Sequence, residues 1–363
     1  MKNFIICLFL LPLFTKAQKK VDLDPFRFSV QVRTLPQTVI DSSYHTYNVK
    51  VNASKMAMPF LKDLDAESIV AMQGWKKLTS NGHLTIDIQV EEILPESVNI
   101  QERTQTIRAK DGTTSVKTNY YEQVKYTFAA TAIVNDYKGM HVMDIPLADR
   151  QYKLTYNGPE FPYKQMAQGY FALNALNVTK ELFRKSITNA LHNLSAQLTN
   201  NFGFDVATIQ DQMWIIDSRK HPEYEAHRNA FLQAKEALFS MNANEPIDKV
   251  KEQLQPVIDY FEKIKLQYTT MNKHDRKIRY ASYYNLAVIY YYLDDPQSML
   301  KQASGLILND YDTNDGKAFE YTARTLKNIF ENTHIYSRHF PINISTYKGP
   351  FENNSKAGVA SAK

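Results

Sequence analysis

Apolar and polar residues alternate with a period of two through much of residues 24–155. This alternation is expected of strands that bury one face and expose the other. It is clearest in four stretches, which are 26–32, 47–51, 84–90 and 124–134. We therefore predict that the first part of the chain forms a mainly antiparallel sheet.

Turn and helix signals between these stretches indicate how the strands connect. Asp111-Gly112 favours a tight hairpin whose arms would be 98–109 and 114–134. The first part of this hairpin is polar, so we expect it to project from the body of the domain. A short helix is predicted from about residue 66 to 72, because apolar residues there follow a helical spacing.

A long helix is predicted within 163–202, where apolar residues recur every three or four positions. They are Phe183, Ile187, Ala190, Leu191, Leu194 and Leu198. Gly203 follows them and suits the end of a helix. We expect this helix to pack on the sheet and to complete the first domain, followed by a short strand within 206–216.

Helical spacing dominates from about residue 221 onward. Two amphipathic stretches, 224–238 and 247–264, are separated by the turn-forming residues 242–246, and a last one covers 319–330. The stretch 279–311 lies between them and gives the most specific signal in the chain. Asp294-Asp295-Pro296 divides it into two short apolar-faced helices, because proline cannot continue the helix before it. An antiparallel helical hairpin is predicted.

This hairpin resembles the tetratricopeptide repeat, a 34-residue helix–turn–helix unit. Three features of the first helix match that pattern, namely the large aromatic residue, the Leu–small pair and the tyrosine, provided here by Tyr283, Leu286, Ala287 and Tyr290. The second helix departs from the pattern, since Met299, Ala303 and Tyr311 replace alanine, an aromatic residue and proline. The resemblance implies a stack of helical hairpins with a concave face for protein recognition.

The tyrosines of the first helix suggest where such a face would bind its partner. Tyr284 and Tyr291 lie off the face formed by Tyr283 and Tyr290. By the resemblance they would line a groove that holds an extended peptide. The alternative is packing, because an aromatic stripe at helical spacing is also typical of a protein core.

The first 17 residues have the pattern of a secretory signal peptide. Lys2 precedes an apolar run at 5–14, and Ala17 gives a small residue at the cleavage position. Cys7 is the only cysteine and lies within that run, so the mature chain is expected to contain no disulfide or thiol chemistry. An exported chain without disulfides favours the periplasm, or association with the outer membrane, of a Gram-negative bacterium. No later segment is apolar for long enough to predict a transmembrane helix.

Charge argues against nucleic-acid binding. Cleavage after residue 17 would remove two of the 43 basic residues and leave 41 against 38 acidic ones, a net charge of +3. Nucleic-acid binders usually carry a concentrated basic stripe, and only short basic runs occur here. The expected partner is instead a protein of the envelope, such as an outer-membrane complex.

The common catalytic motifs are missing from the sequence. There is no nucleophile elbow, zinc-protease motif, phosphate-binding loop or dinucleotide fingerprint. The pairs His221/His227 and His334/His339 are six and five residues apart, which does not suit two ligands on one helical face, so we expect surface or capping positions. We predict no catalytic residues, no metal site and no cofactor.

Carboxylates leave one enzymatic alternative open, because a glycosidase pair meets only in space. Asp87, Glu91 and Glu92 are the nearest candidates. The same residues would equally form the polar face of a half-buried sheet.

These observations combine into one hypothesis. We predict a signal peptide (1–17), an α+β domain of antiparallel sheet with a long packing helix (18–216), an all-α tetratricopeptide-like domain (217–340) and a flexible tail (341–363). The predicted function is non-catalytic protein binding or scaffolding in the bacterial cell envelope, as an accessory subunit of a secretion or envelope-assembly complex. The alternatives are an exported hydrolase of glycan or peptide and a protein that binds cell-wall glycan.

Overall fold

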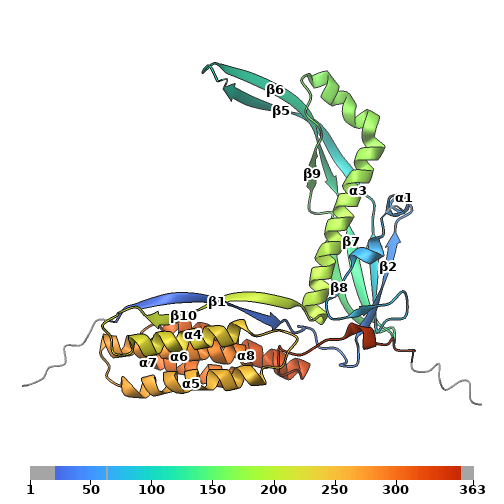
Figure 1. Cartoon of the computed structure of the whole chain (residues 1–363). Coiled ribbons are helices and arrows are strands. Elements are labelled where there is room, and N and C mark those ends of the chain that lie inside the picture. The colour runs from blue at the N-terminus through green and yellow to red at the C-terminus, as the bar shows by residue number, and fades with distance from the viewer. Residues whose placement is uncertain (1–20, 63, 109, 353–363) are drawn as a thin grey trace, which may run out of the picture. The chain divides into compact units, whose positions relative to one another are not determined.

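Figure 1 shows the computed structural model of the chain, which describes residues 21–62, 64–108 and 110–352. These residues form two compact units. The helical unit contains 21–33 and 206–341, and the sheet unit contains 34–205 and 342–352. The predicted signal peptide, 1–17, lies outside the described residues. Within the described part of the chain, no helix combines the length and the apolar character needed to cross a membrane.

The sheet unit is built on a five-stranded sheet with the order β3-β2-β4-β7-β8. β2 runs parallel to β3 and β4, whereas β7 is antiparallel to both of its neighbours. The strands are β2 (Thr46–Ala53), β3 (Lys76–Lys77), β4 (Leu84–Val90), β7 (Ala130–Asp136) and β8 (His141–Ala148). Two short helices, α1 (Met58–Leu61) and α2 (Ala66–Ile69), lie in the connection after β2, which lets β3 and β4 run parallel to it.

A second, three-stranded sheet extends the unit. It consists of β5 (Leu94–Arg108), β6 (Thr114–Thr127) and β9 (Leu154–Asn157) in the order β5-β6-β9. The predicted hairpin turn is present, with Gly112 at a φ of +86° that favours glycine. The predicted arm 114–134 is divided, because the chain leaves this sheet after Thr127 and enters the five-stranded sheet at Ala130.

The long helix α3 (Lys164–Phe202) covers the five-stranded sheet with its second half. Its apolar side chains join one core with the inner face of the strands, including Phe183, Leu191, Ile86 and Ala132. The predicted apolar face of this helix is confirmed at all six positions that define it.

A two-stranded ribbon belongs to the helical unit, not to the sheet unit. β1 (Leu23–Arg33) and β10 (Val206–Ile216) pair antiparallel over their full length. The inner face of the ribbon packs on the helices, with Phe28 and Met213 in the same core as Phe231. The division into units therefore differs from the predicted domain boundary at 216/217, since both strands of the ribbon belong to the helical unit. An alternating pattern shows which side of a strand is apolar, but it does not show which core that side covers.

Five helices complete this unit among the described residues, and each overlaps a stretch in which helical spacing predicted a helix. They are α4 (Tyr224–Phe239), α5 (Asp248–Gln267), α6 (Lys273–Tyr292), α7 (Pro296–Asn309) and α8 (Thr313–Thr333). Two of them, α6 and α8, begin before the predicted stretches, which start at 279 and 319. α6 and α7 approach closely at Gly305, where an added Cβ would overlap the ring of Tyr283. Lys265 of α5 also lies over the ring of Tyr283, with its Nζ 4.6 Å from the ring centre.

The residues after α8 are held in place as far as they are described. Residues 334–341, here called the strap, pack on the helical unit through the ion pair of Arg338 with Asp294. In the sheet unit, Tyr347 stacks on His45 and its carbonyl oxygen accepts a hydrogen bond from Lys76 Nζ at 2.7 Å. The predicted flexible tail thus differs from the structure over 341–352, because side-chain and main-chain contacts fix this segment. The remainder, 353–363, lies outside the described residues.

Candidate functional site

Helix α6 is fixed at both of its ends. Asn272 caps its first turn, with its Oδ1 accepting hydrogen bonds from the backbone N–H groups of His274 and Asp275, each at 2.9 Å. At the other end Asp294 adopts a left-handed conformation, and Asp295 caps α7 by accepting from Ser298 N at 2.9 Å. The predicted break at this sequence therefore comes from a left-handed turn followed by a capped helix start.

A buried asparagine attaches α6 to the ribbon. Asn285 accepts a hydrogen bond from Trp214 N and donates one to Trp214 O, both at 2.8 Å. In this way its carboxamide acts as a neighbouring strand would and satisfies one backbone unit at the edge of β10. The attachment places Tyr284, the preceding residue on α6, directly beside the ribbon.

A pocket of about 300 Å³ opens at this junction. Its lining comes from both strands and from α6, and consists of Arg27, Gln210, Asp211, Gln212 and Tyr284. Gln210 and Gln212 lie on the same face of β10, and Arg27 is the cross-strand partner of Gln212. One cation and two carboxamides thus line the pocket beside the ring of Tyr284.

Among the described residues that line this pocket, Asp211 is the only carboxylate, and its oxygens are already engaged. Its Oδ2 accepts from Tyr292 Oη at 2.9 Å, and its Oδ1 accepts from Gln212 N at 2.7 Å. Burial raises the pKa of Asp211 above its ordinary value, although these hydrogen bonds act in the opposite direction. The carboxylate therefore supports the wall of the pocket instead of standing free as a base.

An aromatic cluster forms the other side of the site. Tyr284 meets Trp214 and Phe319 edge to face, with ring centres 6.0 Å and 4.9 Å apart. Burial and the nearby Asp211 carboxylate raise the pKa of Tyr284 to about 12. Its hydroxyl consequently stays protonated at neutral pH and can donate a hydrogen bond.

Tyr291, the second predicted groove residue, lies in a different environment. It is two turns further along α6, and the guanidinium of Arg338 covers its ring at 4.3 Å. Tyr290 and not Tyr291 lines a second pocket of about 410 Å³, together with residues of α5 and of the α6–α7 turn such as Lys251 and Asp295. The structure therefore does not bring Tyr284 and Tyr291 into one pocket.

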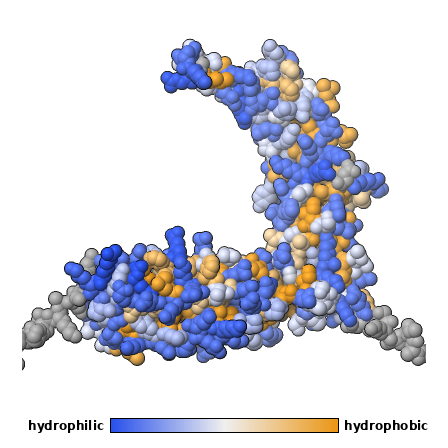
Figure 2. Space-filling view, viewed as in Figure 1, coloured by the Kyte–Doolittle hydropathy of each residue, from blue (hydrophilic) through white to orange (hydrophobic). Residues whose placement is uncertain are grey.

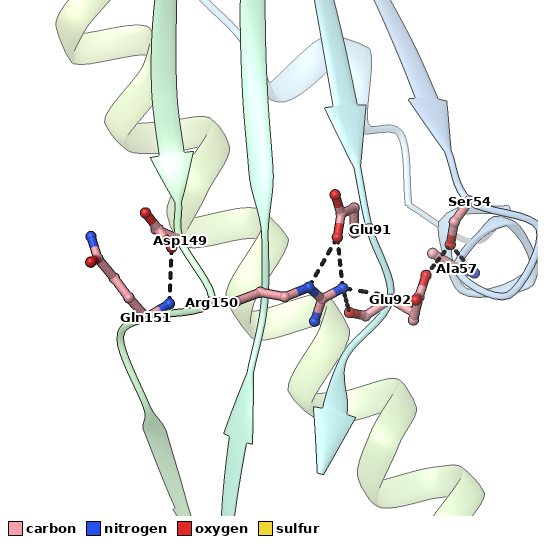
Figure 3. A network of polar contacts seen from close by, with 7 residues as sticks. All are labelled: Ser54, Ala57, Glu91, Glu92, Asp149, Arg150 and Gln151. Atoms are coloured by element: carbon pink, nitrogen blue, oxygen red, sulfur yellow. Dashed lines mark hydrogen bonds and ion pairs between the residues drawn. The ribbon is translucent and has the colours of Figure 1, made fainter. Parts of the chain in front are cut away.

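Two of the three carboxylates considered for catalysis, Glu91 and Glu92, belong to a separate network in the sheet unit, shown in Figure 3. Arg150 donates to Glu91 Oε2 from Nε at 3.0 Å and from Nη2 at 2.8 Å. Its Nη2 also reaches the main-chain oxygen of Glu92 at 3.0 Å. The hydrogen bond from Ser54 Oγ, at 2.7 Å, is the main cause that lowers the pKa of Glu92. A glycosidase acid needs the opposite shift. Both side chains are already engaged by hydrogen bonds, Glu91 with Arg150 and Glu92 with Ser54.

The other residues considered as catalytic or metal-binding candidates, Asp87 and the histidines, also lie in structural positions. Asp87 accepts hydrogen bonds from Asn52 at 2.7 Å and Gln89 at 2.8 Å on the polar face of the sheet. His227, expected near the surface, is fully buried on the inner side of α4, so that expectation was wrong. Its position in the apolar series of this helix already pointed inward. In the described residues, no three His, Cys, Asp or Glu side chains gather as a metal site would require.

The residues that the ribbon contributes to this pocket could not be predicted from the sequence. Arg27 and Gln212 are 185 positions apart and become neighbours only through strand pairing. The one available signal was Asp211, an acidic residue at a position whose neighbours Ile209 and Met213 face inward. A polar residue at an apolar position of a strand indicates either a buried partner or a site.

Comparisons with known proteins leave the family open. No protein-family model and no curated protein matches the sequence. The chain is similar to a solved structure from Helicobacter pylori described as a neuraminyllactose-binding hemagglutinin homolog, with 11% identity and a TM-score of 0.21. The match covers 45% of this chain and 87% of that one. At this TM-score the likeness carries no argument about function.

Proposed function

We propose that this protein is a non-catalytic binding component of the bacterial cell envelope, and that its helical unit holds an extended segment of a protein partner beside Tyr284. The pocket formed by Tyr284, Arg27 and the two glutamines carries this proposal. It offers hydrogen-bond donors and acceptors next to an aromatic surface, while its single carboxylate is engaged. The resemblance of α6 and α7 to a tetratricopeptide hairpin adds the expectation of a peptide-binding face.

Strand geometry favours a peptide as the occupant. Side chains two residues apart on a strand repeat about every 7 Å, which is also the repeat of an extended peptide. Gln210 and Gln212 can therefore contact successive peptide units, with Arg27 across from the second. The indole Nε1 of Trp214 is buried without an acceptor in the described part of the chain, and a peptide carbonyl at this junction could satisfy it after a small movement.

The proposed function in the cell envelope also requires that the chain is exported from the cytoplasm. The pattern of residues 1–17 supports a signal peptide and thus a periplasmic or outer-membrane-associated location. Cell fractionation followed by N-terminal sequencing tests this step. A mature chain that begins at Gln18 is expected, and an unprocessed chain in the cytoplasm would contradict it.

Affinity capture from solubilised envelope, with mass spectrometry of the proteins retained, tests the binding role. We expect Tyr284→Ala to lose a partner that the unchanged protein and Tyr321→Ala retain. Tyr321 is the matched control because it lies on α8 and is 74% exposed. Equal capture by all three proteins would exclude this pocket as the binding site.

Fluorescence separates direct binding from an indirect effect. The chain has two tryptophans, and Trp214 contacts Tyr284 whereas Trp75 lies in the core of the sheet unit. Titration of a captured partner's peptides into a Trp75→Phe protein should change the Trp214 emission, and Tyr284→Ala should weaken that response by about tenfold or more. Hydrolysis of a glycan or peptide by the purified protein would instead favour the enzymatic alternative.

A further inference from the structure

The apolar face of α3 continues beyond the sheet that covers it. The helix contains 39 residues and is about 58 Å long, whereas β4 and β7 contain seven residues each and span about 24 Å. Its second half is buried on the strands through residues such as Phe183 and Leu194. Among the described residues, the same face of its first half is exposed, for example at Leu173 and Leu176.

Four residues define this uncovered face, here called the seam. They are Met166, Gly169, Leu173 and Leu176, which follow the spacing 3, 4, 3 of a heptad seam. Leu173 is 87% exposed, Leu176 72% and Met166 50%. Figure 2 shows apolar surface along the upper part of this helix. A single exposed leucine is ordinary, but a heptad row of them on one helix is not.

The hairpin cannot cover the seam, because it already holds a different side of the helix. Glu122 of β6 is buried, and its Oε2 accepts a hydrogen bond from the backbone N–H of Phe171 at 2.7 Å. Tyr170 packs against Phe161 next to β6, with ring centres 5.6 Å apart. The first half of α3 is thus fixed by its own sheet while the seam faces away from it.

Charge makes the seam suitable for contact with an identical helix. Between Lys164 and Lys180 the chain contains no Asp, Glu, Lys or Arg. The positions that flank the seam are small or uncharged, for example Ala172 and Asn177. A second copy of the same segment can therefore approach without repulsion between like charges.

We propose that the seam binds the seam of a second copy of this chain, with the two helices antiparallel. In an antiparallel pair, Leu173 of one copy lies opposite Gly169 of the other, and Leu176 lies opposite Met166. Each bulky leucine at the centre then faces a glycine, and a Cβ at Gly169 would meet nothing within 4 Å in the single chain. The free space at Gly169 is therefore available to the leucine of the partner copy.

The chemistry of the surface favours this occupant over a lipid membrane. A helix that lies in a membrane interface combines a broad apolar face with a basic opposite face. The seam is narrow, Gln165 and Asn177 border it, and the opposite side is occupied by the hairpin. An interface of about three helical turns is small, so a reversible, concentration-dependent dimer is expected.

Sedimentation velocity over a range of protein concentrations tests the proposal. The unchanged protein should shift from monomer to dimer as concentration rises, and Leu173→Glu should remain monomeric. Gln168→Glu is the matched control, because it adds the same charge to an exposed position of the same helix outside the seam and should dimerise normally. Far-ultraviolet circular dichroism should be unchanged in both variants, since both side chains are exposed.

Disulfide trapping tests the register. In a Cys7→Ser background, a Gly169→Cys chain mixed with a Leu173→Cys chain should give a covalent dimer faster than Gln168→Cys mixed with Leu173→Cys. Equal trapping in both mixtures, or a monomer at every concentration, would overturn the proposal. It would also be overturned if the monomer bound anionic lipid vesicles in a manner that Leu173→Glu abolished.

Discussion

A single buried side chain makes the helical unit sensitive to acid. His227 is fully buried between the rings of Tyr260 and Phe261, and neither of its ring nitrogens has a hydrogen-bond partner in the described residues. Burial lowers its pKa from 6.5 to about 3. The folded protein therefore binds a proton at His227 only at a lower pH than the unfolded chain does.

The expected consequence is a loss of stability as the pH falls through the window from about 6.5 to 3. Above that window His227 is neutral in both the folded and the unfolded state, so the free energy of unfolding does not change. At pH 5 the free energy of unfolding is lower by about 2 kcal/mol. Denaturation followed by Trp214 fluorescence at pH 7 and pH 5 measures it. His227→Leu should flatten the dependence, and His192→Leu, at an exposed position of α3, should not. A slope that His227→Leu leaves unchanged would assign the acid sensitivity to another group.

A second prediction at the residue scale concerns Gly305. Glycine within a helix is normally about 1 kcal/mol less favourable than alanine. At Gly305, however, a Cβ would overlap the ring of Tyr283, which Lys265 covers from another side. We expect Gly305→Ala to destabilise the helical unit by about 1–3 kcal/mol. Gly169→Ala, at a helical glycine with open space around it, should be neutral or stabilising, and the same sign at both positions would contradict the packing described here.

At the scale of elements, the strap is held to the helical unit by a buried ion pair. Arg338 Nε donates to Asp294 Oδ1 at 2.6 Å, and the two side chains are 6% and 1% exposed. Asp294 also accepts hydrogen bonds from Ser337 Oγ and from Arg338 N. The strap therefore completes the turn between α6 and α7, which would otherwise contain a buried and uncompensated carboxylate.

Removing Arg338 should be far more damaging than removing an exposed arginine. Arg338→Ala is expected to destabilise the helical unit by about 3–5 kcal/mol, because it leaves Asp294 charged and unpaired. Arg324→Ala breaks an exposed ion pair with Glu320 on α8 and should cost less than about 1 kcal/mol. Guanidinium denaturation of both variants provides the comparison, and similar losses would show that the strap is not held by this pair.

At the scale of the whole molecule, the chain inserts the sheet unit between the two strands of the ribbon. β1 ends at Arg33 and β10 begins at Val206, so residues 34–205 form one long excursion from the helical unit. Each unit has its own core, which includes Ile88 in one and Leu254 in the other. Because closing a longer loop adds little entropic cost, the ribbon can pair whether or not the inserted unit is folded.

We therefore predict that the two units respond separately to core mutations. Leu254→Ala should lower the midpoint of the Trp214 transition by an amount equivalent to about 2–5 kcal/mol and leave the Trp75 transition in place. Ile88→Ala should do the reverse. Single-tryptophan proteins, Trp75→Phe and Trp214→Phe, allow each transition to be followed alone. A shift of both transitions by either mutation would show that the units unfold as one.

Local pattern was sufficient to predict most elements of this protein. The spacing of apolar residues located α3 and the helices α4–α8, and Asp111-Gly112 located the hairpin turn, because period and turn chemistry depend on residues close in sequence. The arm 114–134 was predicted as one strand because its alternation continues unbroken while the chain changes sheet. The candidate site was predicted only at Tyr284, which lies in the pocket. Tyr291, predicted beside it, lies under Arg338 instead.

The sequence by itself determined which face of the long helices and of the main strands is apolar, roughly where those helices lie, and the absence of cysteine downstream of Cys7. Only the tertiary structure decided that β1 and β10 cover the helices, that Asp211 turns inward to Tyr292, and that the seam of α3 is exposed. The physical reason is that burial of apolar surface is non-directional. A periodic pattern therefore predicts which face of a helix or strand is buried, whereas the element that packs on this face depends on residues distant in sequence.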